Sequence, residues 1–216
     1  MQEYYARRAS EYEKIYHRDE ATRQAEQNQI VAAISQALGG KSVLEVAAGT
    51  GYWTQFVTQV ATRTVATDIN QEVLEIARQT KILPNTELVQ ADAFMLPFKV
   101  SSFTGGLANF WFSHLKKDHR DKFFRHFHSK LQPGAAIFVA DNVYNEGVGG
   151  ERVTVPEDAD NTYKRRALED GSTYLIIKNY PSTEELVQQF SQYDSQFSES
   201  SMHYGRHFWY LTYTLR

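Results

Sequence analysis

Residues 43–56 have the sequence VLEVAAGTGYWTQF. Residues 43–46 form the kind of apolar run that is typical of a buried strand. Gly49-Thr50-Gly51 follows as a turn, because glycine adopts backbone conformations that other residues avoid. The segment that begins at Tyr52 then favours a helix. A strand, a glycine turn and a helix in direct succession predict a ligand site at the carboxyl end of the first strand of an open α/β sheet.

Outward from this stretch, strand-like and helix-like segments alternate along the chain. Asn70 is expected to cap one helix, and Gln132-Pro133-Gly134 to stop another. Strands joined by helices form a parallel sheet that is covered on both faces, and we predict that architecture here. The strands are predicted at residues 41–46, 63–68, 86–92, 102–110 and 135–141, and the helices at residues 4–37, 52–60, 70–80 and 118–131.

The pattern changes after Asp141. Residues 142–162 are polar and are predicted to be irregular. Residues 163–168 and 172–180 then flank the turn Glu169-Asp170-Gly171, and their alternation predicts a β-hairpin.

The closing part of the chain predicts one helix and two strands. Ser182 or Thr183 begins the helix as its capping residue. Residues 194–204 and 207–216 alternate polar and apolar side chains and are predicted to pair antiparallel across Gly205-Arg206. Because no repeat, linker or low-complexity tract divides the chain, residues 1–216 are predicted to form a single domain.

The composition argues against several classes of function. A net charge of −3 offers no strongly basic surface for nucleic acid or an anionic membrane. Without cysteine the chain has no disulfide, no cysteine–zinc site and no thiol nucleophile. The charged N-terminal stretch is unlike a signal peptide, and no run approaches the roughly 20 apolar residues that a membrane span needs. We therefore expect a soluble, cytoplasmic protein.

Two features of the glycine turn argue against a dinucleotide ligand. A dinucleotide fingerprint has the form G-x-G-x-x-G, whereas Gly49-Thr50-Gly51 is followed by Tyr52-Trp53-Thr54 and lacks the third glycine. Glu45 also lies near the end of the strand. A carboxylate is a poor neighbour for a pyrophosphate and a good one for a cationic amine.

The same stretch resembles motif I of the class I S-adenosylmethionine-dependent methyltransferases, which is written [D/E]-x-[G/A/x]-x-G-x-G. Three further landmarks fit that family: Asp68 at the end of the second strand, Ala91-Asp92-Ala93-Phe94 after the third, and Leu131-Gln132-Pro133-Gly134 before the fifth. Ala47 departs from the pattern, since many members have glycine there, and little consequence is expected. The resemblance covers residues 40–141.

The resemblance implies a doubly wound, Rossmann-like α/β fold with a mostly parallel seven-stranded sheet and an antiparallel C-terminal strand. Residues 1–38 would form an N-terminal helical lid, residues 40–141 the cofactor-binding core, residues 142–181 a β-hairpin insertion after strand five, and residues 182–216 the closing helix and strands.

The cofactor that the resemblance implies is S-adenosylmethionine. Asp68 would bind the ribose hydroxyls, Asp92 and an adjacent backbone N–H the adenine, and Glu45 would lie near the methionine amino group. Cofactor contacts are predicted for Tyr16, Glu45, Ala47, Gly49, Thr50, Gly51, Trp53, Thr54, Asp68, Ile69, Asp92, Ala93, Phe94 and Asn109.

The methyl acceptor is predicted to be a small aromatic or amine molecule that is methylated on oxygen or nitrogen. His114 is the candidate general base, because imidazole transfers protons near neutral pH, and Asp141 is the second candidate. Either residue can equally be an ordinary loop group. Lys178 and Arg165-Arg166 can bind a carboxylate or phosphate, or lie in solvent. Acceptor contacts are predicted for Tyr5, Trp111, Asn142, Tyr144, Tyr163 and Lys178.

Other functions remain open on the sequence alone. Asp141-Asn142 resembles the metal ligands of catechol-type O-methyltransferases, but Asn109 stands where that family has a third ligand, an aspartate. One carboxylate and two amides make a weak Mg²⁺ site, so no metal is predicted. A nucleotide-dependent oxidoreductase and a non-catalytic S-adenosylmethionine-binding module are the alternatives. We expect a monomer or homodimer with no nucleic-acid or membrane partner.

Overall fold

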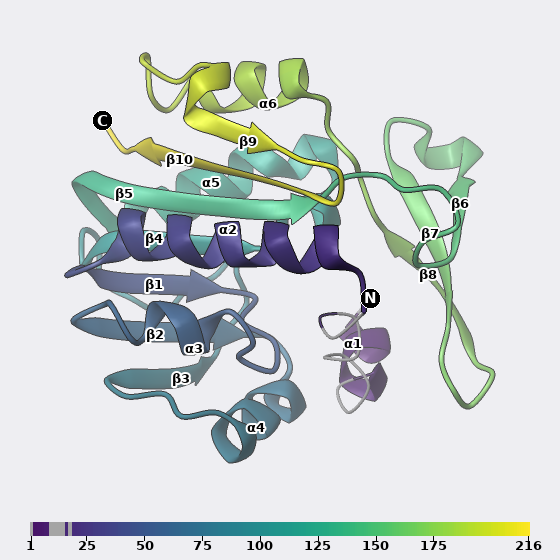
Figure 1. Ribbon diagram of the computed structural model, residues 1–216, viewed down its shortest axis with the longest axis horizontal. Helices are drawn as coiled ribbons and strands as arrows, with labels where there is room; N and C mark the ends of the chain where they lie inside the picture. The colour runs from purple at the N-terminus through teal and green to yellow at the C-terminus, as the bar shows by residue number, and fades with distance from the viewer. Residues whose placement is uncertain (1, 9–15, 17–18) are drawn as a thin grey trace.

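The computed structural model describes residues 2–8, 16 and 19–216, and these residues form two β-sheets with helices around the larger one (Figure 1). The strands of the large sheet are β1 (Ser42–Val46), β2 (Arg63–Asp68), β3 (Thr86–Gln90), β4 (Phe103–Asn109), β5 (Leu131–Asn142), β9 (Met202–Tyr204) and β10 (Phe208–Thr214). The small sheet contains β6 (Glu151–Thr154), β7 (Thr162–Ala167) and β8 (Thr173–Ile177).

The large sheet has seven strands in the order β3-β2-β1-β4-β5-β10-β9 within the described part of the chain. β1 pairs in parallel with β2 and β4, whereas β10 pairs antiparallel with β5 and with β9. The predicted mostly parallel sheet with an antiparallel C-terminal strand is confirmed. The order reverses beside β1, which is where open α/β sheets bind their ligands.

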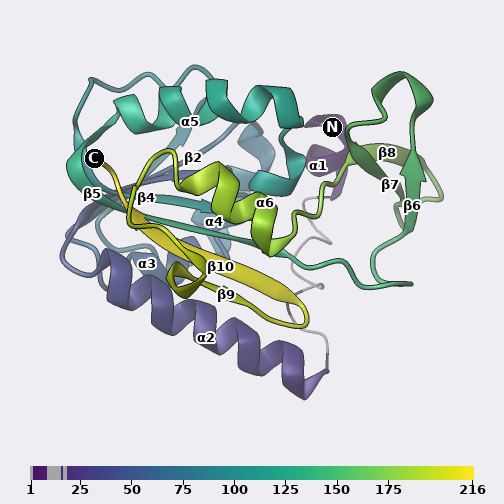
Figure 2. The same cartoon turned by 90° about the horizontal axis from the view of Figure 1, so that it is seen from above.

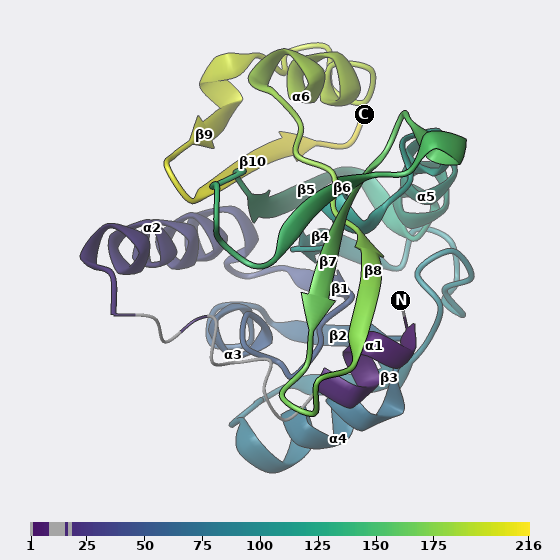
Figure 3. The same cartoon turned by 90° about the vertical axis from the view of Figure 1, so that its right-hand side faces the viewer.

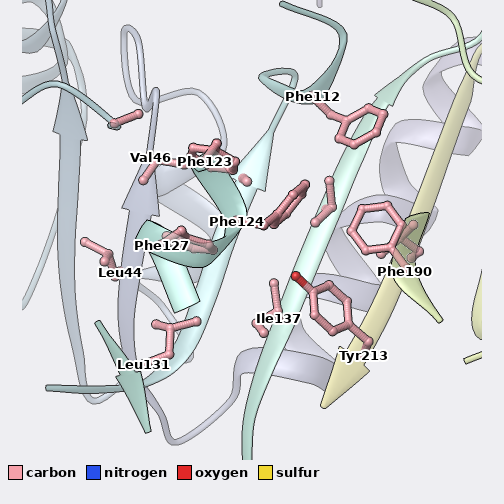
Figure 4. Close-up of a cluster of buried hydrophobic side chains, with 14 of the residues drawn as sticks. Leu44, Val46, Phe112, Phe123, Phe124, Phe127, Leu131, Ile137, Phe190 and Tyr213 are labelled. Atoms are coloured by element: carbon pink, nitrogen blue, oxygen red, sulfur yellow. The ribbon is translucent and has the colours of Figure 1, made fainter. Parts of the chain in front are cut away.

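Helices cover both faces of the large sheet (Figure 2). α2 (Ala21–Leu38) and α3 (Thr54–Val57) lie on one face, and α5 (Arg120–Ser129) and α6 (Thr183–Phe190) lie on the other. Under α5, Phe123, Phe124 and Phe127 pack on strand residues such as Leu44 and Ile137 (Figure 4). The central strands β1, β2, β4 and β5 are therefore mostly buried, as expected for a parallel sheet covered on both faces, whereas the edge strand β3 is only partly buried.

The N-terminal helix is shorter than predicted. α1 spans only Gln2–Arg8, Tyr16 lies in a turn, and α2 begins at Ala21, so the expected continuous helix over residues 4–37 is wrong. Residues 9–15 and 17–18 of the predicted helix lie outside the described residues. α2 packs Ile30, Ile34 and Leu38 into the core of the large sheet, so of the described N-terminal helices only α1 is placed like a lid.

The insertion after β5 contains more structure than predicted. β7 and β8 form the expected hairpin, with Tyr163 paired to Ile177. Residues 142–162, expected to be irregular, contribute β6, which pairs with β7 and makes a three-stranded sheet. Its residues are mostly exposed, so this strand lacks the apolar alternation that sequence reasoning depends on.

Several element ends also differ from the prediction. The helix predicted at residues 52–60 is the single turn α3, and residues 194–204 form a strand only at β9. α5 ends at Ser129, and Gln132-Pro133-Gly134 lies inside β5. Asn70 occupies the N-cap position of α4 (Gln71–Thr80) without a side-chain capping bond, whereas Ser182 and Glu185 form a complete capping box on α6.

The carboxyl ends of the parallel strands face α1 and the small sheet (Figure 1). Arg7 of α1 donates to Tyr174 Oη at 2.8 Å and to Asp170 Oδ2 at 2.5 Å, so α1 is tied to the turn of the β7–β8 hairpin. Figure 3 looks onto this edge and shows the hairpin passing in front of the large sheet with α1 beside it. Among the described residues, no helix is both long and apolar enough to cross a membrane.

Candidate active site

A cavity of about 280 Å³ lies at the carboxyl ends of β1, β2 and β4, where the strand order reverses. This volume is near the lower end of the range of small-molecule sites, roughly 300–1,000 Å³. Its walls come from α1, the glycine turn, the ends of β2 and β3, and the segment after β4. The lining residues are Tyr5, Ala47, Gly49, Thr50, Asp68, Ile69, Asn70, Val73, Ala91, Asp92, Ala93, Phe94, Phe110, Trp111 and His114.

The carboxylate of Asp68 fixes the glycine turn. Asp68 Oδ2 accepts the backbone N–H of Gly49 at 3.0 Å, and Oδ1 accepts that of Asn70 at 2.9 Å. Burial raises the pKa of this carboxyl, and the N–H groups of Asn70, Gly49 and Ile69 oppose the rise. The side chain at the end of β2 therefore shapes the turn after β1 and also faces the cavity.

Backbone conformation explains the residues of the turn. Gly49 has a φ of +57°, lines the cavity, and would meet no protein atom within 4 Å if it carried a Cβ. Gly51 has a φ of +78°, and a Cβ there would come within 3.1 Å of Ala77 on α4. Ala47 also has a positive φ, +54°, a conformation that costs an L-residue roughly 1–2 kcal/mol. Ala47 is therefore strained where glycine would not be, and the expectation that this departure has little consequence stays a prediction.

Two polar side chains beside the cavity have atoms without partners. Glu45 on β1 is 2% exposed, and its Oε2 has no hydrogen-bond partner among the described residues. Asn109 at the end of β4 is 5% exposed, and neither its Oδ1 nor its Nδ2 has one. Burial raises the pKa of Glu45 to about 8, with Thr54 opposing and Asp68 adding to the rise. Unpaired buried polar atoms are costly, so both residues suit a polar ligand group.

On the far wall, Asp92 and three aromatic side chains follow β3 and β4. Asp92 Oδ1 accepts the backbone N–H of Phe94 at 2.8 Å, and the ring of Phe94 lies edge-to-face with Trp111, their centroids 6.5 Å apart. Phe110 adopts a φ of +56° and stacks on Trp53 with ring centroids 5.4 Å apart. A bulky residue with positive φ is rare, and such strain is concentrated at functional sites.

His114, in the 3₁₀ helix η2 (Phe112–His114), forms hydrogen bonds both to α1 and to the small sheet. Its Nδ1 lies 2.7 Å from the carbonyl oxygen of Ile177, so Nδ1 carries the proton. Its Nε2 lies 2.8 Å from the hydroxyl of Tyr5, and in the neutral ring it accepts a hydrogen bond from that hydroxyl. Burial lowers the pKa of His114 to about 3, with the charges of Lys178 and Arg166 acting in the same direction.

The negative charge of Asp141 is compensated by the ammonium group of Lys178. Lys178 Nζ donates to Asp141 Oδ1 at 2.9 Å and to Ser113 Oγ at 2.6 Å. Asp141 also accepts the backbone N–H groups of Ser113 and Asn142 at 2.8 and 2.7 Å. Burial favours a higher pKa for Asp141, but Lys178, His114 and these donors outweigh it, and the net shift is downward. The carboxylate is ionised, buried and saturated with donors.

Residues 43–134 match the protein family described as "Methyltransferase domain". The matched segment begins with β1 and contains the glycine turn, Asp68 and Asp92. No curated protein matches the sequence. Over these residues the class I S-adenosylmethionine-dependent methyltransferase recognised from the sequence is confirmed.

Solved structures share the fold over nearly the whole chain. The DhpI–SAH complex is 25% identical, with a TM-score of 0.71 over 98% of this methyltransferase and 93% of that chain. The DhpI–SAM–HEP complex is also 25% identical, with a TM-score of 0.72 over 97% of this chain and 94% of that one. PH0226 protein from Pyrococcus horikoshii OT3 has a TM-score of 0.71 at 14% identity, over 95% and 99% of the two chains, which shows the fold alone.

The structure brings half of the sequence-predicted site residues of the methyltransferase to one cavity. Those that line it are Tyr5, Ala47, Gly49, Thr50, Asp68, Ile69, Asp92, Ala93, Phe94, Trp111 and His114. Glu45, Gly51, Thr54 and Asn109 lie behind this wall and do not line the cavity. Tyr16 and Trp53 also lie behind it, in an aromatic cluster where Tyr16 stacks on Tyr52 with centroids 3.9 Å apart.

The predicted acceptor residues are more scattered. Asp141 and Lys178 form the buried ion pair, and Asn142 lines a second, smaller cavity. The Tyr163 hydroxyl donates to Asp158 at 2.5 Å, away from the first cavity. Tyr144 is exposed and lies under Lys164 Nζ, 5.0 Å from its ring centroid. None of these five residues lines the cofactor cavity.

Sequence reasoning missed Asn70, Val73, Ala91 and Phe110 as lining residues. Asn70 and Val73 follow Asp68 at the start of α4, and Ala91 precedes Asp92, so proximity to the predicted acids would have found these three. Phe110 lies between Asn109 and Trp111, two predicted contacts, so proximity indicates this residue as well. Its place depends on a positive φ and on a ring stack with Trp53, and neither can be derived from local sequence.

Proposed function

We propose that this methyltransferase binds S-adenosylmethionine at the glycine turn and transfers its methyl group to a small molecule held under α1. The observation that carries the proposal is the single cavity whose wall includes both the Gly49–Asp68 contact and the Tyr5–His114 contact. S-adenosylmethionine supplies an electrophilic methyl group on a positively charged sulfur.

The residues present fit that cofactor. The Gly49 turn leaves room for close approach, and Asp68 and Asp92 offer carboxylates to hydroxyl and amine donors. The unpaired Glu45 and Asn109 lie near the end of the cavity where the resemblance to the family places the methionine part. Phe110 and Trp111 exclude water from the same end and can contact a cation with their ring faces. These residues would thus orient the methyl donor and exclude water from the site. Orientation of the reactants is the main contribution that a methyl transfer needs from the protein.

Lys178 supports metal-independent transfer. Its ammonium group already lies 2.9 Å from Asp141, the only carboxylate of the Asp141–Asn142–Asn109 set. Within the described part of the chain, no cluster of three histidine, aspartate or glutamate residues is arranged to hold a metal. Turnover is expected to survive EDTA, and loss of activity that Mg²⁺ restores would contradict this.

Calorimetry with S-adenosylmethionine, S-adenosylhomocysteine and NAD tests the proposal. We expect saturable binding of the first two and none of NAD, followed by acceptor-dependent release of S-adenosylhomocysteine in an acceptor screen. Binding of NAD alone would favour the oxidoreductase. Cofactor binding without turnover on any acceptor would favour a non-catalytic module.

A further inference from the structure

A second cavity, of about 60 Å³, also borders α1. Tyr5 lines the cofactor cavity, and Arg8, one helical turn later, lines this smaller one. Arg23 and Arg166 line it as well, together with Asn142 and Tyr180. No carboxylate lines this cavity among the described residues. Three guanidinium groups around a space of this size suit one acid group, because guanidinium binds carboxylate and phosphoryl oxygens with two donors at once.

Arg166 is built into this cavity from the hairpin strand β7. Its guanidinium lies against Gly149, which has a φ of +73°, and would have to shift if residue 149 carried a Cβ. The Nε of Arg166 is buried and has no hydrogen-bond partner in the part of the chain that the structure describes. The adjacent Arg165 is different: it is exposed and pairs with Glu151 at 2.9 Å. A buried donor without a partner is costly unless a ligand completes it.

The charge of this region acts on its neighbours. The positive charges of Arg166 and Arg8 oppose protonation of the buried Lys178, whose pKa is lowered chiefly by burial. After burial, the positive charges of Lys178 and, more weakly, Arg166 lower the pKa of His114, which lines the cofactor cavity, and the charge of Asp141 opposes them. The field of the small cavity therefore extends to the place where a methyl acceptor would lie. A cationic amine would be repelled there, and an anion would be attracted.

Neither of the two predicted bases, His114 and Asp141, is free to take a proton from an acceptor. Both ring nitrogens of His114 are engaged, Nδ1 with Ile177 and Nε2 with Tyr5, and its pKa of about 3 makes it a weak proton acceptor. Asp141 is saturated by Lys178 and two backbone N–H groups. A nucleophile that arrives already deprotonated needs no base.

We infer that the acceptor is a small organic oxyacid, a carboxylate or a phosphoryl acid, whose anionic group lies against Arg166 and Arg8 and is methylated on oxygen. This inference rests on the proposed methyl transfer. An oxygen lone pair of the acid attacks the methyl carbon, the bond from that carbon to sulfur breaks, and its electron pair stays on sulfur. The product is a methyl ester and a neutral thioether, and no proton is released. Because a cation and an anion react to give neutral groups, a water-poor site favours the step.

The test measures binding to the full-length protein saturated with S-adenosylhomocysteine. Calorimetry compares benzoate and phenylphosphonate, which distinguish the two acid types, with benzyl alcohol and benzylamine. At least one acid is expected to bind about tenfold or more tightly than the neutral and cationic analogues. Methyl ester formation by that acid in the presence of S-adenosylmethionine is then followed by mass spectrometry. If the acids bind no better than benzyl alcohol or benzylamine, the inference is wrong.

Arg166→Gln and Arg165→Gln form a matched pair of variants. Arg166→Gln is expected to weaken acid binding by about tenfold or more, and Arg165→Gln to leave it unchanged, with S-adenosylhomocysteine affinity retained in both. Arg166→Lys should give an intermediate affinity, because it keeps the charge and loses the two-donor geometry. Equal acid binding by Arg166→Gln and Arg165→Gln would overturn the inference. Failure of the wild-type protein to bind S-adenosylhomocysteine would instead overturn the proposed function.

Discussion

The proposed cofactor side of the cavity, at Gly49, Asp68 and Asp92, and the proposed acceptor side, at Tyr5 and His114, are assembled in different ways. On the cofactor side, Asp68 binds the turn at Gly49 across 19 positions, and Asp92 binds Phe94 two positions away. On the acceptor side, Tyr5 meets His114 across 109 positions, and His114 meets Ile177 across 63. The first group lies on consecutive β–α units of one sheet, whereas the second connects α1, η2 and the small sheet.

This difference explains what each side depends on. The cofactor side is held by backbone turns at strand ends, and these form wherever the sheet forms. The acceptor side is held by a few polar contacts between elements that are far apart in the sequence, above all the buried Lys178–Asp141 pair. Substitutions on the acceptor side should therefore disturb folding as well as binding, and substitutions on the cofactor side should mainly disturb binding.

The largest expected effect is on the acceptor side. Lys178→Met leaves the fully buried Asp141 without its counter-charge and should lower the free energy of unfolding by about 3–5 kcal/mol. The pKa of Asp141 is lowered in the folded protein, so its ionised form stabilises the wild type at pH values above the unfolded pKa of the carboxyl. The stability difference between wild type and variant should therefore shrink when acid protonates Asp141. Urea unfolding of the wild type and of Lys178→Met, measured at neutral and at acidic pH, checks this.

The matched control is the double variant Asp141→Asn with Lys178→Met, which removes both charges. It should recover much of the lost stability, because replacing a buried pair costs far less than breaking it. If Lys178→Met keeps wild-type stability but prevents acceptor binding, Lys178 contacts the acceptor, and the contrast between the two sides fails.

On the cofactor side, Asp68→Ala should affect binding more than folding. It removes the acceptor for the N–H groups of Gly49 and Asn70 and should weaken S-adenosylhomocysteine binding by roughly 1.5–3 kcal/mol, as for a hydrogen bond to a charged group. Calorimetry measures the affinity, with the exposed Asp118→Ala as the control. An unchanged affinity in Asp68→Ala would remove this residue from the site.

The same contrast explains how much the sequence could predict. The glycine turn, Asp68 and Asp92 lie at strand ends that apolar runs make visible, so the sheet and this wall of the cavity follow from local pattern. The ion pair between Lys178 and Asp141 depends on how the insertion folds back, which local pattern does not determine. β6 and the positive φ of Phe110 were missed for the same reason. His114 was found by its chemistry, but its low pKa depends on burial that only the fold provides.

The pH dependence of stability tests whether His114 is buried and has a low pKa. Its pKa is about 3 in the folded protein and about 6.5 when unfolded, so the unfolded state binds more protons between these values. Stability should therefore fall as pH falls below about 6.5, by up to about 1.4 kcal/mol per pH unit for this one group. His128, with a pKa lowered to about 4 by burial, acts in the same direction. Glu45, with a pKa raised to about 8, instead reduces stability as pH rises from about 4.5.

His114→Gln isolates the contribution of this histidine. Between pH 5 and 6, the slope of unfolding free energy against pH should be shallower in the variant than in wild type by up to about 1.4 kcal/mol per unit. Turnover by the wild-type protein should not fall between pH 7 and 5. If His114 were an exposed imidazole base, the wild type would lose activity below about pH 6.5. Equal slopes, or a rate that falls near pH 6.5, would mean that His114 is accessible to solvent and available as the base.

The smallest expected effect concerns Ala47, on the cofactor side. Its φ of +54° costs an alanine roughly 1–2 kcal/mol, while glycine loses about 0.4–1 kcal/mol more backbone entropy on folding. Ala47→Gly should therefore raise the free energy of unfolding by about 0.5–1 kcal/mol, seen as a higher urea midpoint at unchanged m. Ser101→Gly, with the same φ of +54° outside the cavity lining, is the control and should gain a similar amount. S-adenosylhomocysteine affinity should not change in either variant if the turn is already rigid. If Ala47→Gly weakens binding while Ser101→Gly gains stability, the methyl group of Ala47 contacts the ligand. The strain at Ala47 would then belong to binding, although the fold alone imposes the same conformation at Ser101.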